Sequence, residues 1–592
     1  MSDPQSTGPR GEPASNGAGR SRFPGFGRDI PPTAGRPPQI RFGYVPLGVV
    51  FVAFVVMVAL VPSKTSGSST PAPLPYNTDS GSAGPGGQVA ARTVTGDVPV
   101  CTDRKDQVAN DPYSPPCFTY TGTDNGGETT RGITPTTIRV AYRVTPDTDY
   151  ASVVQQMAAS DIPPDSPEAI QRTMHGLVEY FNKNFQFYGR KIELVPYDAK
   201  GTVIGEIFGG GQDTATADAV KVDTELNVFA DVSAITEPYA NALTKRKIVA
   251  LSPPYVSDQW FQERRPYGWS LAPSCSLVSR AATEYANNKL FGRPAKWAGG
   301  DLKDKTRTIA VITPDNPEYQ RCADDGMKVI EGAGNHALRL TYTLDLSNLS
   351  NQAASLIARL KSEGITSVGC ACDPLLPIFL TNKAEEQGYQ PEWLVMGTAL
   401  TDSDFAGQLY NKNQWKRAFG ASALGDQLPV INNEAYRAYK TIASDEPSHS
   451  AELLYYQLYM LAIGFQMAGP NLTPQTFEAG MLAYPERTGE AGTWKFLPGK
   501  YTPQIDAREI YWDNDKISPF DFRKGAYAAV GPRIRLGGVS KDEPQVFENA
   551  PTTTAPPLPA APGAPPAPDP AAPPPTGPAE TTTTTTKKAD GS

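Results

Sequence analysis

Two hydroxyl side chains, Ser233 and Thr236, lie where a predicted strand ends and a predicted helix begins. The strand covers 228–235, Thr236 is a residue type that caps helices, and Pro238 falls in the first helical turn. The first N–H groups of a helix have no partner inside it, and the helix dipole makes this end positive. The pattern predicts a site for an anionic ligand group. The alternative is that Ser233 and Thr236 only cap the helix.

Side chains that commonly catalyse reactions form no recognisable motif. The sequence contains no Gly-x-Ser-x-Gly, no His-Glu-x-x-His and no Gly-x-x-x-x-Gly-Lys-[Ser/Thr]. His175 lies beside the apolar face of a predicted helix, and His336 and His449 lie near loops without recognisable partners. We therefore expect a protein that is not an enzyme and holds no cofactor.

Charge and cysteine spacing argue against nucleic acid and metal as partners. The net charge is −8, and the longest basic run of the central region is 245–247. Phosphate binding needs clustered Lys and Arg, so no nucleic acid is expected. Cys-x-Cys spacing and three histidines do not suggest a zinc site.

Predicted strands and helices alternate through the centre of the chain. The first run has strands at 138–142, 191–197 and 228–235 and helices at 168–185 and 213–227. A second run begins near 273, with strands at 309–313, 339–343, 367–372 and 393–397 and helices at 274–290, 317–331, 349–362 and 375–387. Such alternation predicts an α/β fold with two doubly wound, parallel-sheet lobes.

The lobe boundaries follow from these two runs. Lobe 1 is predicted at about 131–272 plus 440–510, and lobe 2 at about 273–439. The apolar stretch 453–467 is interrupted by glutamines, which predicts a buried core helix, and the strand-like segment 509–512 is expected to return to lobe 1.

One segment predicts the topology of the chain at a membrane. Residues 43–61 carry no charge, and at about 1.5 Å per residue they just reach across a hydrocarbon core of about 30 Å. Arginines precede the segment, so the N-terminus is expected in the cytoplasm and the remainder outside the cell membrane. The alternative is a cleaved signal peptide, although a 1–42 tail is long for one and 58–61 is a poor cleavage site.

The segments that flank the lobes are polar and poor in core residues. Residues 1–42 are predicted to be a disordered cytoplasmic tail, and 546–592 a disordered Pro/Thr-rich tail. Residues 62–130 are predicted to be a flexible spacer that ends in a lead-in closed by a disulfide, followed by the two-lobed domain at 131–545.

All six cysteines follow the apolar segment, on the oxidising side of the membrane, which favours disulfides. Cys101 and Cys117 enclose a short polar loop and are expected to pair. The pairing of the other four is left open. Cys370 and Cys372 are expected to face opposite sides of a strand and to have different partners. The four cysteines are Cys275, Cys322, Cys370 and Cys372.

Six segments carry a resemblance to a known family. They occur in the family's order and span about 132–530: 132–140 (GITPTTIRV), 188–198 (YGRKIELVPYD), 247–254 (KIVALSPP), 313–319 (TPDNPEY), 384–393 (AEEQGYQPEW) and 468–474 (AGPNLTP). The chain resembles type I periplasmic binding proteins, specifically the leucine/isoleucine/valine-binding branch that supplies ABC importers. The resemblance implies two lobes joined by a hinge, with a ligand cleft between them.

The resemblance also implies which residues contact the ligand. A serine at the strand end and the neighbouring helix start hold the ligand carboxylate in amino-acid-binding members, and Ser233 falls on that serine. A second contact loop matches 252–257, and Tyr319 matches a cleft tyrosine, with half-buried packing as its alternative role. The candidates carried by these matches are Ser233, Thr236, Ser252, Tyr255, Ser257 and Tyr319.

The chain departs from the amino-acid binders where they hold the ligand ammonium. Their two acidic residues align with Cys275 and Thr398. A buried ammonium needs a paired charge, so an α-amino acid ligand is in doubt. Asp373 is a candidate substitute, and a helix cap is its alternative role. If Cys275 and Cys372 both lined the cleft, they could pair there and restrict it.

These observations predict a membrane-anchored extracytoplasmic solute-binding protein. It would capture a small polar ligand, amino-acid-like or an amide, between two lobes for uptake by an ABC permease. One alternative is a ligand sensor or regulator that reports closure to another protein. The other is a cell-envelope assembly factor with a vestigial cleft.

Overall fold

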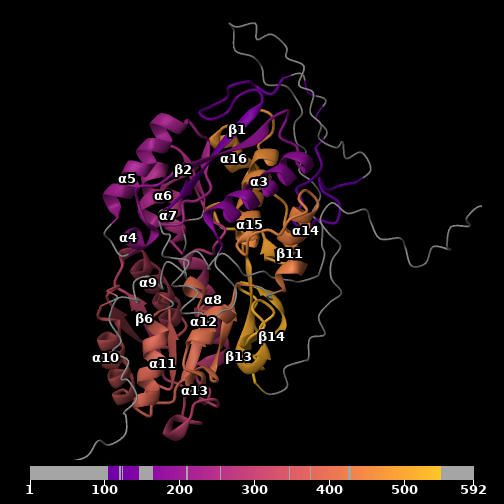
Figure 1. Ribbon diagram of the computed structural model, residues 1–592. Helices are drawn as coiled ribbons and strands as arrows, with labels where there is room; N and C mark the ends of the chain where they lie inside the picture. The colour runs from indigo at the N-terminus through magenta and orange to yellow at the C-terminus, as the bar shows by residue number, and fades with distance from the viewer. Residues whose placement is uncertain are drawn as a thin grey trace, which may run out of the picture. The chain divides into compact units, whose positions relative to one another are not determined.

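The computed structural model describes residues 104–145, 165–207 and 211–547, with short gaps at 119, 121, 123, 252, 254, 346, 374 and 425–427 (Figure 1). The predicted cytoplasmic tail, the apolar segment 43–61, Cys101, Ser252 and the Pro/Thr-rich tail from 548 onward lie outside the described residues. Within the described ranges, no helix combines the length and the apolar character that a membrane span requires.

The first lobe is built on a five-stranded sheet with the strand order β2-β1-β3-β4-β5. All of its strand pairs are parallel, and Val140 lies beside Leu194 on one side and Ala230 on the other. This order confirms a doubly wound lobe. Its strands are β1 (Thr137–Val144), β2 (Lys191–Asp198), β3 (Ala230–Asp231), β4 (Val249–Leu251) and β5 (Gly268–Trp269).

Helices from two distant parts of the chain enclose this sheet. The early ones are α3 (Pro167–Asn184), α4 (Val203–Ile207), α5 (Gln212–Lys221) with the π-helical η1 (Val222–Leu226), α6 (Glu237–Lys245) and α7 (Asp258–Glu263). The late ones are α14 (Glu434–Lys440), α15 (Ala451–Met467) and α16 (Pro474–Ala483), with the turn η5 (Val430–Asn432) and the hairpin β11 (Arg487–Gly489) and β12 (Gly492–Trp494).

Helix α15 is the central helix of the first lobe. It is apolar on all sides and almost wholly buried, and it packs against α3 and α16, as Figure 1 shows. The ring of Tyr455 stacks on Phe181 with centroids 5.5 Å apart. The prediction that this stretch is a buried core helix is confirmed.

The second lobe is built on a seven-stranded sheet with the strand order β14-β13-β10-β9-β8-β6-β7. The pairs from β7 to β10 are parallel, and β13 and β14 join them antiparallel. The strands are β6 (Ile309–Pro314), β7 (Ala337–Tyr342), β8 (Ser367–Cys370), β9 (Glu392–Val395), β10 (Ala418–Ser422), β13 (Asp506–Ile517) and β14 (Lys524–Arg535).

The helices of the second lobe follow the predicted alternation with its strands. They are α8 (Cys275–Tyr285) with the π-helical η2 (Ala286–Leu290), η3 (Gly300–Leu302), α9 (Pro317–Gly332), α10 (Leu349–Ser362), α11 (Leu376–Glu386), η4 (Thr398–Leu400), α12 (Asp404–Leu409) and α13 (Lys412–Trp415). Apolar residues at helical spacing, such as Leu356, Ile357 and Leu360 on α10, face the core.

The predicted return of 509–512 to the first lobe is wrong. These residues belong to β13, which pairs antiparallel with β10, so that Phe419 lies beside Tyr511. The sequence prediction contained no strand at β10, which is the strand that β13 pairs with. An unpaired strand edge leaves backbone groups without partners, and β13 supplies them.

The described part of the predicted spacer packs into the first lobe. Tyr113 is completely buried, its ring centroid lies 4.5 Å from that of Trp494, and its hydroxyl donates a hydrogen bond to the carbonyl of Gly492 (2.7 Å). Asp111 accepts a hydrogen bond from the Tyr459 hydroxyl (2.7 Å). The lead-in is therefore part of the folded body.

Candidate functional site

The hydroxyls predicted to hold an anion are bonded to the protein's own carboxylates. Ser233 accepts a hydrogen bond from the Arg143 N–H (2.8 Å) and donates one to Asp231 (2.6 Å). Thr236 occupies the predicted N-cap position of α6, but its hydroxyl donates to Glu206 and does not cap the helix. Among the described residues, no side chain makes a capping hydrogen bond to α6.

A buried ion network positions these two residues. Arg143, at the end of β1, forms salt bridges with Glu206 (2.5 Å) and Asp218 (2.6 Å), and its guanidinium lies 4.2 Å from the Tyr239 ring centroid. Burial would lower the pKa of Arg143, but Glu206 and Asp218 hold it above its ordinary value. The sequence prediction missed this network, because its two carboxylates lie 63 and 75 residues from Arg143 in the chain.

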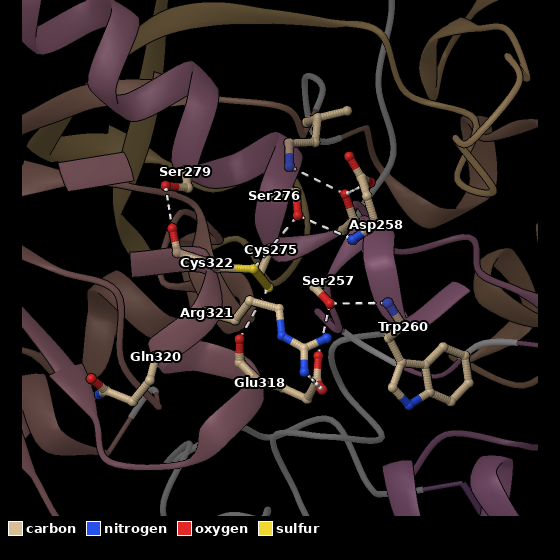
Figure 2. The surroundings of a disulfide bond; sticks show 12 residues. Ser257, Asp258, Trp260, Cys275, Ser276, Ser279, Glu318, Gln320, Arg321 and Cys322 are labelled. Carbon is tan, nitrogen blue, oxygen red and sulfur yellow. Dashed lines mark hydrogen bonds and ion pairs between the residues drawn. A yellow bond between two sulfur atoms is a disulfide. The ribbon is translucent and has the colours of Figure 1, made fainter. Parts of the chain in front are cut away.

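The second predicted contact loop lies between the two lobes. Tyr255 has a positive φ (50°), and its ring is buried in the hydrophobic core of the second lobe. Ser257 caps α7 by accepting a hydrogen bond from Trp260 N–H (3.1 Å), and it donates one to Glu318 (2.8 Å), as Figure 2 shows. Ser257 therefore connects a helix of the first lobe with the first turn of α9 in the second.

Carboxylates from both lobes meet beside this connection. Burial raises the pKa of Glu237 in the first turn of α6, and the negative charge of Glu318 raises it further. Arg321 offsets part of this charge, because its guanidinium lies 3.4 Å from Glu318 and 4.0 Å from Glu263. The facing edges of the lobes are thus acidic, with Arg321 between them.

A cavity in the second lobe lies between α8, α9 and the sheet. Its walls include Thr313 near the end of β6, Ala371 just after β8 and Thr398 after β9, so it reaches the carboxyl ends of these strands. Tyr319 and Cys275 also line the cavity, and its volume is about 530 Å³ when its opening to solvent is included. The positions that the resemblance assigned to a cleft tyrosine and to the two ammonium-binding residues therefore share one cavity.

Two disulfides lie in the second lobe. Cys275 at the start of α8 is bonded to Cys322 on α9, and Cys370 is bonded to Cys372. The predicted separate partners for Cys370 and Cys372 are wrong, because side chains two residues apart point to the same side of a strand and β8 ends at Cys370. The suggested Cys275–Cys372 pair is also wrong, because each of these two cysteines is bonded to another partner. Cys117 is disulfide-bonded, and Cys101 lies outside the described residues.

Asp373 makes the contacts of a helix cap. Its carboxylate accepts hydrogen bonds from the N–H groups of Leu375 (2.8 Å) and Leu376 (3.1 Å) ahead of α11, and from the Tyr342 hydroxyl (2.5 Å). Burial raises its pKa in spite of these bonds. With these partners the carboxylate has its own structural role, and Asp373 is not among the residues that line the cavity.

A second buried carboxylate of this lobe predicts a dependence of stability on pH. One Asp402 oxygen accepts a hydrogen bond from Ser422 (2.5 Å), and the other has no partner among the described residues. Burial raises the pKa of Asp402 to about 6. The folded protein therefore holds a proton that the unfolded chain releases near pH 4. The stability from this proton is complete below that pH and is lost as the pH rises through 6.

We expect Asp402→Asn to reduce the fall in unfolding free energy between pH 4 and pH 8 by about 2 to 3 kcal/mol. Urea unfolding at pH 4, 6 and 8 measures this. Asp515→Asn, at an exposed carboxylate, is the control and should leave the dependence unchanged. The prediction would be contradicted if the unfolding free energy fell equally between pH 4 and pH 8 in Asp402→Asn and in the unchanged chain.

The fold and this cavity define a two-lobed α/β binding protein, and comparison with known proteins identifies its family. Residues 169–508 match the model of a family described as periplasmic binding protein. The match covers more than half of the chain, so the chain belongs to this family, and the resemblance noted above is confirmed. Family members bind solutes, so this chain is a binding protein and not an enzyme.

The solved structures to which the chain is similar include several binding proteins. A substrate binding protein of an ABC transporter from Aeropyrum pernix is 13% identical, with 68% of this chain and 96% of that chain covered and a TM-score of 0.46. A fatty acid ABC transporter substrate-binding protein from Thermomonospora curvata is 14% identical (70% and 96% covered, TM-score 0.47). The leucine binding protein LivK from Thermotoga maritima is 12% identical (68% and 99% covered, TM-score 0.45). No curated protein matches the chain.

Proposed function

We propose that this protein is an extracytoplasmic solute-binding protein that captures a small ligand at the cleft-facing end of its second lobe and delivers it to an ABC importer. The observation that carries the proposal is the cavity at the carboxyl ends of β6, β8 and β9. Ligands of open α/β sheets bind at this edge. Membership of the periplasmic binding protein family supports the same function.

The membrane attachment is a separate part of the proposal. It is supported by the uncharged segment 43–61 and by the arginines that precede it. A single N-terminal anchor would leave the two-lobed body outside the cytoplasm, on a spacer, where it could meet both the solute and a permease.

A thermal-shift panel of amino acids, amides, carboxylic acids, sugars and short peptides tests ligand capture. A ligand at 100 times its dissociation constant should stabilise the folded chain by about 2.7 kcal/mol. Tyr319→Ala should remove the shift, because Tyr319 lines the cavity. Tyr436→Ala removes a tyrosine of the first lobe and is the matched control. If no class of compound in the panel gave a thermal shift, the result would contradict solute capture.

A second function, that of an envelope assembly factor with a vestigial cleft, is favoured by one set of contacts. The hydroxyls of Ser233 and Thr236 are bonded to internal carboxylates, and the Tyr255 ring is buried in the second lobe. These contacts use side chains that would otherwise receive a ligand. A shift in the panel that depends on Tyr319 would exclude this second function.

A further inference from the structure

Small residues on α9 and just after β8 contribute to the open space of the cavity. Ala323 and Gly326 face it from α9, and Ala371 faces it beyond the end of β8. A methyl group added at Gly326 would lie 2.3 Å from the Ser279 hydroxyl oxygen, so α8 and α9 are already in close contact there. The free space therefore lies between the two helices and the sheet, and a ligand that fills it must enter the interior of the lobe.

Most of the cavity wall is apolar. Val278, Val311 and Ile330 contribute hydrocarbon, Met327 and Met396 contribute thioethers, and the Cys275–Cys322 disulfide closes one side. A disulfide carries no charge and cannot become a thiolate, so Cys275 offers no substitute for the acidic residue that aligns with it. Within the described part of the chain, no carboxylate lines this cavity.

The carboxylates near the cavity have partners of their own. Glu318 accepts a hydrogen bond from Ser257 and lies beside Arg321, as Figure 2 shows for the surroundings of the disulfide. Asp373 accepts two backbone N–H groups and the Tyr342 hydroxyl. An ammonium group in the cavity would lack a carboxylate that is free to pair with it, and burying such a charge is strongly unfavourable.

One charged side chain, Arg339 on β7, lines the cavity, and one of its donors is unused. Its Nη1 is paired with Asp324, and its Nη2 donates to Gln320. Its Nε–H is buried and has no hydrogen-bond partner among the described residues. A buried donor without an acceptor is unfavourable, so an oxygen atom supplied by a ligand would stabilise this arrangement.

We infer that the captured solute has a small hydrocarbon body that enters this cavity, carries a carboxylate or amide oxygen that accepts from Arg339, and lacks an ammonium group. The inference rests on the proposed function, since it names the ligand class of the same site. The chemistry of the cavity walls distinguishes this chain from a protein that binds free α-amino acids.

Calorimetric titration of three compounds with one hydrocarbon skeleton tests the inference. Leucine, 4-methylpentanoate and 4-methylpentanamide share this skeleton, and leucine differs from the carboxylate only by its ammonium group. We expect leucine to bind at least about 100-fold more weakly than 4-methylpentanoate, because the ammonium would be buried unpaired. Phenylalanine and 3-phenylpropanoate extend the comparison to a larger body.

Two substitutions locate the binding. Arg339→Met keeps an unbranched apolar side chain but removes the guanidinium, and we expect it to weaken the binding of 4-methylpentanoate about 10-fold or more. Ala323→Leu fills the cavity and should abolish binding while the chain stays folded. The matched controls are Arg359→Met and Ala333→Leu, at exposed positions on α10 and just after α9, and both variants should bind as the unchanged chain does.

The outcomes separate failure of the inference from failure of the proposed function. The inference would be overturned if leucine or phenylalanine bound as tightly as, or more tightly than, the carboxylate with the same skeleton. It would also be overturned if neither 4-methylpentanoate nor 3-phenylpropanoate bound at millimolar concentration. The proposed function of solute capture would still hold if a compound of another chemical class in the thermal-shift panel bound and Tyr319→Ala removed that binding. Binding that survives Ala323→Leu unchanged would also overturn the inference, because the ligand would then lie outside the cavity.

Discussion

Replacement of both Cys275 and Cys322 by alanine is expected to lower the free energy of unfolding by about 4 kcal/mol. The two residues are 47 positions apart, so their bond closes a long loop in the unfolded chain. In the chain-entropy description, the restriction of the unfolded state grows with the logarithm of the loop length. The bond also joins α8 to α9, which together form the helical wall of the cavity.

The disulfide between Cys370 and Cys372 is a matched control within the same lobe. Its cysteines are two positions apart and also buried, so the same double replacement removes sulfur from a comparable environment. The short loop predicts a smaller loss of about 1.5 kcal/mol. Urea unfolding of both double variants under non-reducing conditions measures the difference. Equal losses would show that lost packing, and not loop closure, determines the effect.

The second large effect is expected from Arg143→Met, which should cost about 3 to 5 kcal/mol at neutral pH. Arg143 pairs with Glu206 and Asp218, and the side chains of all three residues are at most 2% exposed. Removing the guanidinium leaves two carboxylates buried without a cation. A buried charge without a partner is strongly unfavourable, and this gives the cost of the substitution.

Urea unfolding at neutral pH measures this cost, and an exposed ion pair provides the control. Arg172→Met breaks an exposed pair with Asp445 and should cost no more than about 1 kcal/mol. Equal losses in the two variants would contradict the buried-charge explanation.

Patterns local in sequence were enough to predict the fold class and much of the element order. Strand and helix periodicity placed β1, β2, α3 and α10 within a few residues, and the apolar stretch 453–467 with its glutamine interruptions indicated the buried helix α15. The ordered family segments predicted the family that the match over 169–508 identifies. These features depend on residues close together in the chain, whose spacing is visible without knowing the fold.

Contacts between distant segments were decided by the tertiary structure alone. Hydrogen bonding to β10 placed β13 in the second lobe, and the packing of α8 against α9 brought Cys275 to Cys322. The folding of α4 and α5 beside β1 bound Arg143 to Glu206 and Asp218, which in turn engaged the hydroxyl of Thr236. The physical reason is that these contacts depend on which groups the whole fold buries together, and no spacing along the chain records that.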